Sequence, residues 1–160
     1  MKCRGLHHPG IVVPDLDRAV AFYCELTSFK KIRETSWTSE HAKFNQVVGL
    51  KSSAARLCLL QGANCYLELF EFSAPVSDLR PAEYGANDYG IRHLCFEFED
   101  VAVALKLVVS LGGAKINEPV CNDSGITAVY CRDPFGNLLE LITPSPDGPL
   151  PSIGSRCRAG

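Results

Sequence analysis

The apolar residues of this chain gather in short runs, separated by polar breaks that often contain glycine or proline. Runs of this length that are rich in β-branched and aromatic residues predict strands. The apolar spacing after Asp15 and Asp100 predicts two helices, each capped by its aspartate. Residues 41–50 are typical of either a short helix or an irregular connection. The predicted strands cover residues 6–13, 29–37, 55–60, 65–72, 90–98, 114–119, 126–131 and 138–143.

The pattern of the first half recurs in the second. When the halves are overlaid without gaps, His8 falls on His93. Each half later carries an apolar strand with one carboxylate inside it, Glu68 in the first and Glu140 in the second. A recurring order of elements indicates two modules, each strand–helix–strand–strand–strand, with approximate twofold symmetry. The other matches are Gly5 with Gly90, Asp15 with Asp100 and Ala19 with Ala104.

The repeat also divides the chain. We expect the first module over residues 1–72 and the second over residues 90–144. Residues 73–89 are polar and broken by prolines and a glycine, which predicts a linker loop. Residues 145–160 contain further prolines and show no periodicity, which predicts a flexible tail.

Composition narrows the class of protein. Apolar residues make up 46% of the 160 residues and charged residues 21%, which is ordinary for a globular chain. The net charge of −2, without a long run of one sign, indicates neither a nucleic-acid nor a membrane partner. No signal-peptide pattern precedes the first strand, so we expect a cytoplasmic protein. None of the eight cysteines forms a Cys-x-x-Cys pair, which favours reduced core thiols over a zinc ribbon.

Two imidazoles and two carboxylates at matching places could bind one divalent first-row metal ion. Nitrogen with carboxylate oxygen suits Zn, Fe, Mn, Co or Ni better than Ca, which prefers oxygen ligands only. Such an ion polarises a carbonyl and stabilises an enolate, while a nearby carboxylate moves the neighbouring proton. The candidate ligands are His8, Glu68, His93 and Glu140, and the candidate catalytic bases are Glu68 and Glu140.

Each of these residues also has an ordinary structural interpretation. A histidine at the start of a strand is more often a surface residue, and a glutamate between leucines usually faces solvent. Recurrence of both residues in both halves favours the metal site. His7 is expected on the opposite face from His8, because neighbouring strand side chains alternate. A structural or exposed residue is therefore expected there, and support of a ligand side chain is the alternative role for His7. Asp133 is predicted to form a turn. Solvated or helix-cap charges are expected at Glu71, Glu97 and Glu99.

Four segments resemble the vicinal oxygen chelate superfamily, which includes glyoxalase I, methylmalonyl-CoA epimerase, extradiol dioxygenases and the fosfomycin- and bleomycin-resistance proteins. The resemblance covers residues 5–144 and implies an α+β fold of two paired βαβββ modules, whose curved mixed sheets form a metal-centred cavity. By position, it implies that the four candidate ligands are the family's ligands. Ser28 departs from the glycine of many members. The segments are 8–19 with Phe22 and Tyr23, 67–69, 90–94 and 133–141.

Because Glu68 fills the fourth ligand place, the chain is similar to the glyoxalase I and epimerase branch. The resemblance implies a divalent-metal-dependent isomerase, epimerase or lyase that acts on a small carbonyl compound through a metal-stabilised enolate. It implies one Zn, Ni, Co, Mn or Fe ion, a small-molecule substrate and a homodimer, with the site inside one chain or across the dimer. Two alternatives stay open: an Fe(II) extradiol-type dioxygenase, and a metal-free protein that binds a small molecule or confers resistance.

Overall fold

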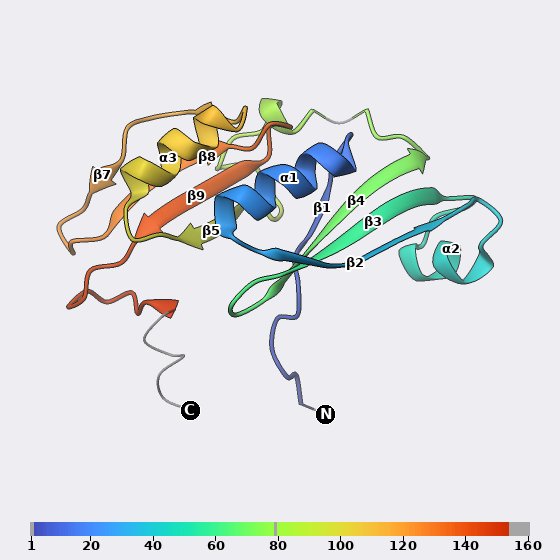
Figure 1. The fold of residues 1–160 in the computed structure, drawn as a ribbon, viewed down its shortest axis with the longest axis horizontal. Coiled ribbons are helices and arrows are strands. Elements are labelled where there is room, and N and C mark those ends of the chain that lie inside the picture. Colours follow the sequence, from blue (N-terminus) through green and yellow to red (C-terminus); the bar gives the residue numbers. More distant parts are fainter. Residues whose placement is uncertain (1, 79, 154–160) are drawn as a thin grey trace. The chain divides into compact units, whose positions relative to one another are not determined.

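Figure 1 shows the computed structural model of the chain, which describes residues 2–78 and 80–153. Contacts within the chain divide it into two compact units, Met1–Leu79 and Arg80–Gly160. Each unit contains one mixed sheet, and three α-helices occur in the described residues. The predicted α+β class is therefore confirmed. No helix in the described ranges is long and apolar enough to cross a bilayer.

The first unit has the predicted βαβββ order, with one further helix inserted. Its elements are β1 (Gly10–Val12), α1 (Leu16–Thr27), β2 (Lys30–Trp37), α2 (Ala42–Val48), β3 (Ala54–Gln61) and β4 (Tyr66–Ala74). The sheet order is β1-β4-β3-β2, with β1 parallel to β4 and the other neighbours antiparallel. β1 begins later than predicted, at Gly10. Pro9 has no N–H with which to continue a regular ladder.

Helix α1 covers one face of this sheet (Figure 1). The Asp15 carboxylate accepts a hydrogen bond from the N–H of Arg18 at 2.9 Å, so the predicted N-cap is confirmed. Ser28 ends the helix with φ of 59°, in the left-handed region that favours glycine. The buried residues of the helix face the apolar side of the sheet. They are Leu16, Ala19, Phe22, Tyr23 and Leu26.

Helix α2 settles the open prediction for residues 41–50. The ring of Phe44 stacks on the buried Trp37, with centroids 4.6 Å apart. Ser53 is also buried, accepts a hydrogen bond from Trp37 Nε1 at 2.9 Å and donates to Asn45 Oδ1 at 2.6 Å. His41 caps the helix, since its Nδ1 accepts from the N–H of Phe44. A satisfied polar network thus attaches α2 to the sheet.

The second unit repeats the topology. Its elements are η1 (Pro81–Glu83), β5 (His93–Glu97), α3 (Val101–Ser110), β6 (Ala114–Lys115), β7 (Val120–Cys121), β8 (Thr127–Arg132) and β9 (Leu138–Thr143). The sheet order is β5-β9-β8-β6, with β7 also paired to β8 and β5 parallel to β9. Asp100 accepts from two N–H groups at the start of α3, so this predicted cap is confirmed as well.

The strand predicted over residues 114–119 is only two residues long. Pairing with β8 stops after Lys115 and resumes at Val120, so β6 and β7 together occupy the place that β2 has in the first unit. Pro119, which lies in the gap, cannot donate to a ladder. The sequence pattern therefore located the strand correctly but overestimated its length.

The turn between β8 and β9 is built around Asp133, as predicted. This side chain is 2% exposed, and its carboxylate accepts from the N–H groups of Phe135 and Asn137 and from the Asn137 amide. These bonds fix the start of β9, which carries Glu140.

Part of the predicted flexible tail has described positions, whereas residues 154–160 lie outside the described residues. The hydroxyl of Ser152 and the N–H of Ile153 donate to the carboxylate of Glu97, the second at 2.8 Å. Glu97 was expected to be a solvated or cap charge; it instead binds the segment after β9 to β5.

Candidate active site: two histidine–glutamate pairs

The first pair lies at the edge of the first sheet. Leu67 and Leu69 are buried, so strand alternation turns Glu68 to the opposite face. There the Glu68 Oε2 lies 3.2 Å from Nε2 of His8, with 20% of the glutamate side chain exposed. The N–H of Glu68 donates to the carbonyl of Pro9 at 3.0 Å, which aligns the segment holding His8 with β4.

The second unit contains an equivalent pair. Leu139 and Leu141 are buried, which turns Glu140 to the other face of β9. Its Oε2 lies 3.3 Å from Nε2 of His93, and 23% of the glutamate side chain is exposed. The expectation that each glutamate faces away from the apolar core is correct, and in each unit that face also carries a histidine.

The local register of the two pairs is the same, but the residue opposite each glutamate differs. Gly10 of β1 lies opposite Glu68, and Cys95 of β5 lies opposite Glu140. Each stands two residues after the histidine of its pair. Desolvation is the main cause that raises the pKa of the Cys95 thiol to about 12, and the negative charge of Glu140 is the next. Cys95 is therefore a neutral neighbour of Glu140, and it is exposed although it lies in an apolar strand, where a buried thiol is the usual expectation.

Two residues contact the histidines from outside the pairs. Nδ1 of His7 lies 2.7 Å from Nδ1 of His8, so the prediction that His7 faces away is wrong. Residues 7 and 8 precede the regular part of β1, where alternation does not apply. In the second unit, the Tyr130 hydroxyl lies 3.4 Å from Nδ1 of His93. Sequence reasoning missed Tyr130, although its place opposite Glu140 follows from the register of β8 and β9.

The donor types fit a divalent metal ion, because each pair offers one imidazole nitrogen and one carboxylate oxygen. In the described residues, no three His, Cys, Asp or Glu side chains gather closely enough to hold an ion. Two donors are fewer than a resident metal ion requires, so neither pair suffices by itself. The ligand set of His8, Glu68, His93 and Glu140 thus stays a prediction.

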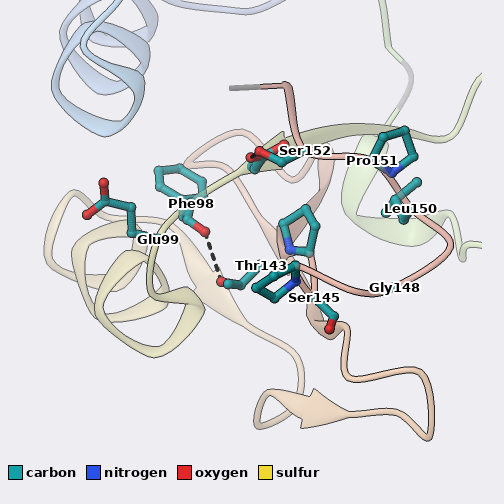
Figure 2. A pocket seen from close by; sticks show the side chains of 11 residues that line it. Phe98, Glu99, Thr143, Ser145, Gly148, Leu150, Pro151 and Ser152 are labelled. Carbon is teal, nitrogen blue, oxygen red and sulfur yellow. Dashed lines mark hydrogen bonds between the residues drawn. The ribbon is translucent and has the colours of Figure 1, made fainter. Parts of the chain in front are cut away.

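A cavity of about 840 Å³ lies in the second unit at the other end of β5 (Figure 2). His93 begins this strand, whereas the cavity starts at Glu97, about 13 Å further along a strand of this length. The Thr143 hydroxyl donates to the carbonyl of Phe98 at 2.9 Å on its wall (Figure 2). The remaining wall comes largely from residues 144–152. The cavity is therefore separate from the His93–Glu140 pair.

A family model described as the glyoxalase/bleomycin resistance protein/dioxygenase superfamily matches residues 5–141. The chain belongs to this superfamily. The match includes all four candidate ligands, and it confirms the resemblance that the repeated motifs indicated.

Two proteins that are similar to this superfamily member in sequence are named as enzymes. A 2-epi-5-epi-valiolone epimerase from Actinomyces sp. is 31% identical over 144 residues, covering 86% of this chain and 78% of the relative. A probable lactoylglutathione lyase from Synechocystis sp. is 26% identical over 145 residues, covering 88% and 95%. The crystal structure of a glyoxalase family protein from Bacillus cereus has a TM-score of 0.80 at 22% identity, covering 89% and 95%, which supports the fold.

Proposed function

We propose that this protein is a divalent-metal-dependent isomerase, epimerase or lyase that acts on a small carbonyl compound. The observation that carries the proposal is the recurrence of one geometry, His Nε2 facing Glu Oε2 at 3.2 Å in one unit and 3.3 Å in the other. Chance seldom repeats such a pair at matching positions of an internal repeat. The names of the epimerase and lyase relatives support the same reaction class.

In this proposal His8, Glu68, His93 and Glu140 hold one Zn, Ni, Co, Mn or Fe ion. The bound ion would supply Lewis acidity, which polarises a carbonyl oxygen and acidifies the neighbouring C–H bond. The carboxylates are about one-fifth exposed, so a small substrate can reach them while most of each side chain stays out of water.

Glu68 or Glu140 then acts as the base. Its carboxylate takes the proton from the carbon next to the carbonyl, and the electron pair of that C–H bond moves towards the carbonyl oxygen. Returning the proton to the opposite face of the same carbon gives epimerisation, and delivering it to the adjacent carbon gives isomerisation. Expulsion of a leaving group one carbon further along gives the lyase reaction.

The test uses substrates that the relatives' names indicate, 2-epi-5-epi-valiolone and the glutathione hemithioacetal that corresponds to lactoylglutathione. Proton transfer next to the carbonyl is followed as deuterium incorporation from D₂O by NMR. We expect exchange that is lost with a chelator and lowered about a hundredfold or more in Glu68→Gln or Glu140→Gln. Glu25→Gln, an exposed change on α1, is the matched control. Exchange that survives both substitutions would contradict the assignment of the base.

The same variants test whether the four ligands come from one chain or from two chains of a homodimer. Glu68→Ala and Glu140→Ala proteins are unfolded together and refolded as a mixture. If the pairs come from different chains, a mixed dimer contains one site with all four ligands, and activity returns in part. If both pairs come from the same chain, every site lacks one glutamate and no activity returns.

A further inference from the structure

The two candidate ligand histidines share a feature beyond the glutamate that each faces. In both, Nε2 points at the glutamate, while Nδ1 has a second partner: His7 for His8 and the Tyr130 hydroxyl for His93. A neutral imidazole carries one proton, and the hydrogen bond of one nitrogen decides whether the other has a free lone pair. The partner of Nδ1 therefore controls whether Nε2 can bind a metal ion.

We propose that His7 and Tyr130 are positioning residues, which accept the Nδ1–H bonds of His8 and His93 and thereby leave both Nε2 atoms free to bind the ion. This inference rests on the proposed function. It assigns roles to two residues that are not themselves candidate ligands.

His7 is placed for this role by the strand beside it. Its ring stacks on Tyr66 with centroids 4.8 Å apart and planes 18° from parallel, and its carbonyl accepts from the N–H of Tyr66 at 3.2 Å. Two Nδ1 atoms at 2.7 Å must share one proton. If His8 supplies that proton, the Nδ1 of His7 is the acceptor and the proton of His7 lies on Nε2.

Tyr130 reaches the second histidine from the far side of Glu140. It lies on β8 opposite Glu140, and its ring packs edge-on against that of His93, with centroids 5.1 Å apart. A phenol hydroxyl has both a donor and acceptor sites, so it can accept from Nδ1–H. The distance of 3.4 Å is longer than that in the first unit, so we expect the larger effect from His7.

The test measures the affinity for Zn²⁺ by competition with a chromogenic chelator. His7→Phe keeps a ring that can stack on Tyr66 but removes the acceptor, and His7→Asn puts a carbonyl oxygen near the position of Nδ1. Tyr130→Phe removes only the hydroxyl, and Tyr89→Phe, at a fully exposed position, is its control. We expect a loss of affinity on the order of tenfold in His7→Phe and less in Tyr130→Phe. His7→Asn should recover most of the loss, and Tyr89→Phe should show none.

A second readout distinguishes positioning from general damage to the fold. Long-range ¹H–¹⁵N spectra of the Zn²⁺-loaded protein report which nitrogen of each histidine is protonated. We expect Nδ1–H for His8 and His93 and Nε2–H for His7. Unchanged affinity in His7→Phe and Tyr130→Phe, or failure of His7→Asn to recover it, would overturn this inference alone. Wild-type protein that takes up no Zn²⁺ or other divalent ion would overturn the proposed function with it.

Discussion

Arg56 on β3 donates from Nη2 to Oδ1 of Asp17 in the first turn of α1, at 2.8 Å. The same guanidinium contacts the carboxylates of Glu34 at 2.9 Å and Glu71 at 3.5 Å. Glu71 also accepts from the N–H of Leu16 at 3.0 Å, as expected of a charge near a helix start. One arginine thus joins the beginning of α1 to the strands beneath it.

The cluster of Arg56 with its three carboxylates predicts how the stability of the first unit depends on pH. The hydrogen bond from Arg56 lowers the pKa of the Asp17 carboxyl. Hydrogen bonds from Lys31, which has the larger effect, and from Arg56 lower the pKa of the Glu34 carboxyl. A carboxyl whose folded pKa is lowered adds stability above its unfolded pKa of about 4, and this is lost as pH falls through the folded value. Arg56→Met should therefore lower the urea midpoint at about pH 7 and much less at about pH 3. Arg33→Met, on the exposed side of β2, is the control, and equal losses at both pH values would contradict the prediction.

The buried network under α2 predicts a stability loss that fluorescence can follow. Trp37 is the single tryptophan of the chain and is 5% exposed, so its emission reports on the first unit. Ser53→Ala leaves the Nε1–H of Trp37 without its acceptor and should cost about 1–3 kcal/mol in urea unfolding. Ser73→Ala removes an exposed hydroxyl and should cost no more than about 0.5 kcal/mol. Similar losses in the two variants would refute the importance of the network.

Loss of the Asp133 carboxylate is expected to destabilise the second unit, because this side chain holds the turn between β8 and β9 together. Asp133→Ala removes the acceptor of two backbone N–H groups and one amide, so unfolding should become easier by roughly 2 kcal/mol or more. Circular dichroism in urea measures the change. Asp123→Ala, at an exposed position of the same unit, should leave the midpoint nearly unchanged. A loss below about 0.5 kcal/mol for Asp133→Ala would show that water replaces the carboxylate.

Some features of this chain follow from sequence because a single local rule determines them. Asp15 and Asp100 cap helices because aspartate accepts from the first N–H groups, and Glu68 and Glu140 leave the core because their neighbours Leu67 and Leu139 enter it. The order of both modules follows from the repeat in the same way.

Other features depend on contacts between segments, which no local rule supplies. His7 turns towards His8 because Tyr66 of β4 offers a ring to stack on, and Tyr130 reaches His93 only because β8 and β9 pair in a particular register. The anchoring of Ser152 on Glu97 likewise joins residues more than fifty positions apart. Sequence reasoning therefore found the two histidine–glutamate pairs as candidates, gave His7 a supporting role only as an alternative, and missed Tyr130.

The most direct measurement is the metal content of the dialysed protein by mass spectrometry, for wild type, Glu68→Ala, Glu140→Ala and the control Glu25→Ala. We expect about one divalent ion per chain in wild type and control, and much less in both other variants, because the proposed function assigns both pairs to the same ion. Iron bound equally by wild type and Glu68→Ala would indicate the ring-cleaving dioxygenase instead. Absence of any bound ion in wild type, even after incubation with divalent metals, would contradict the four-ligand site.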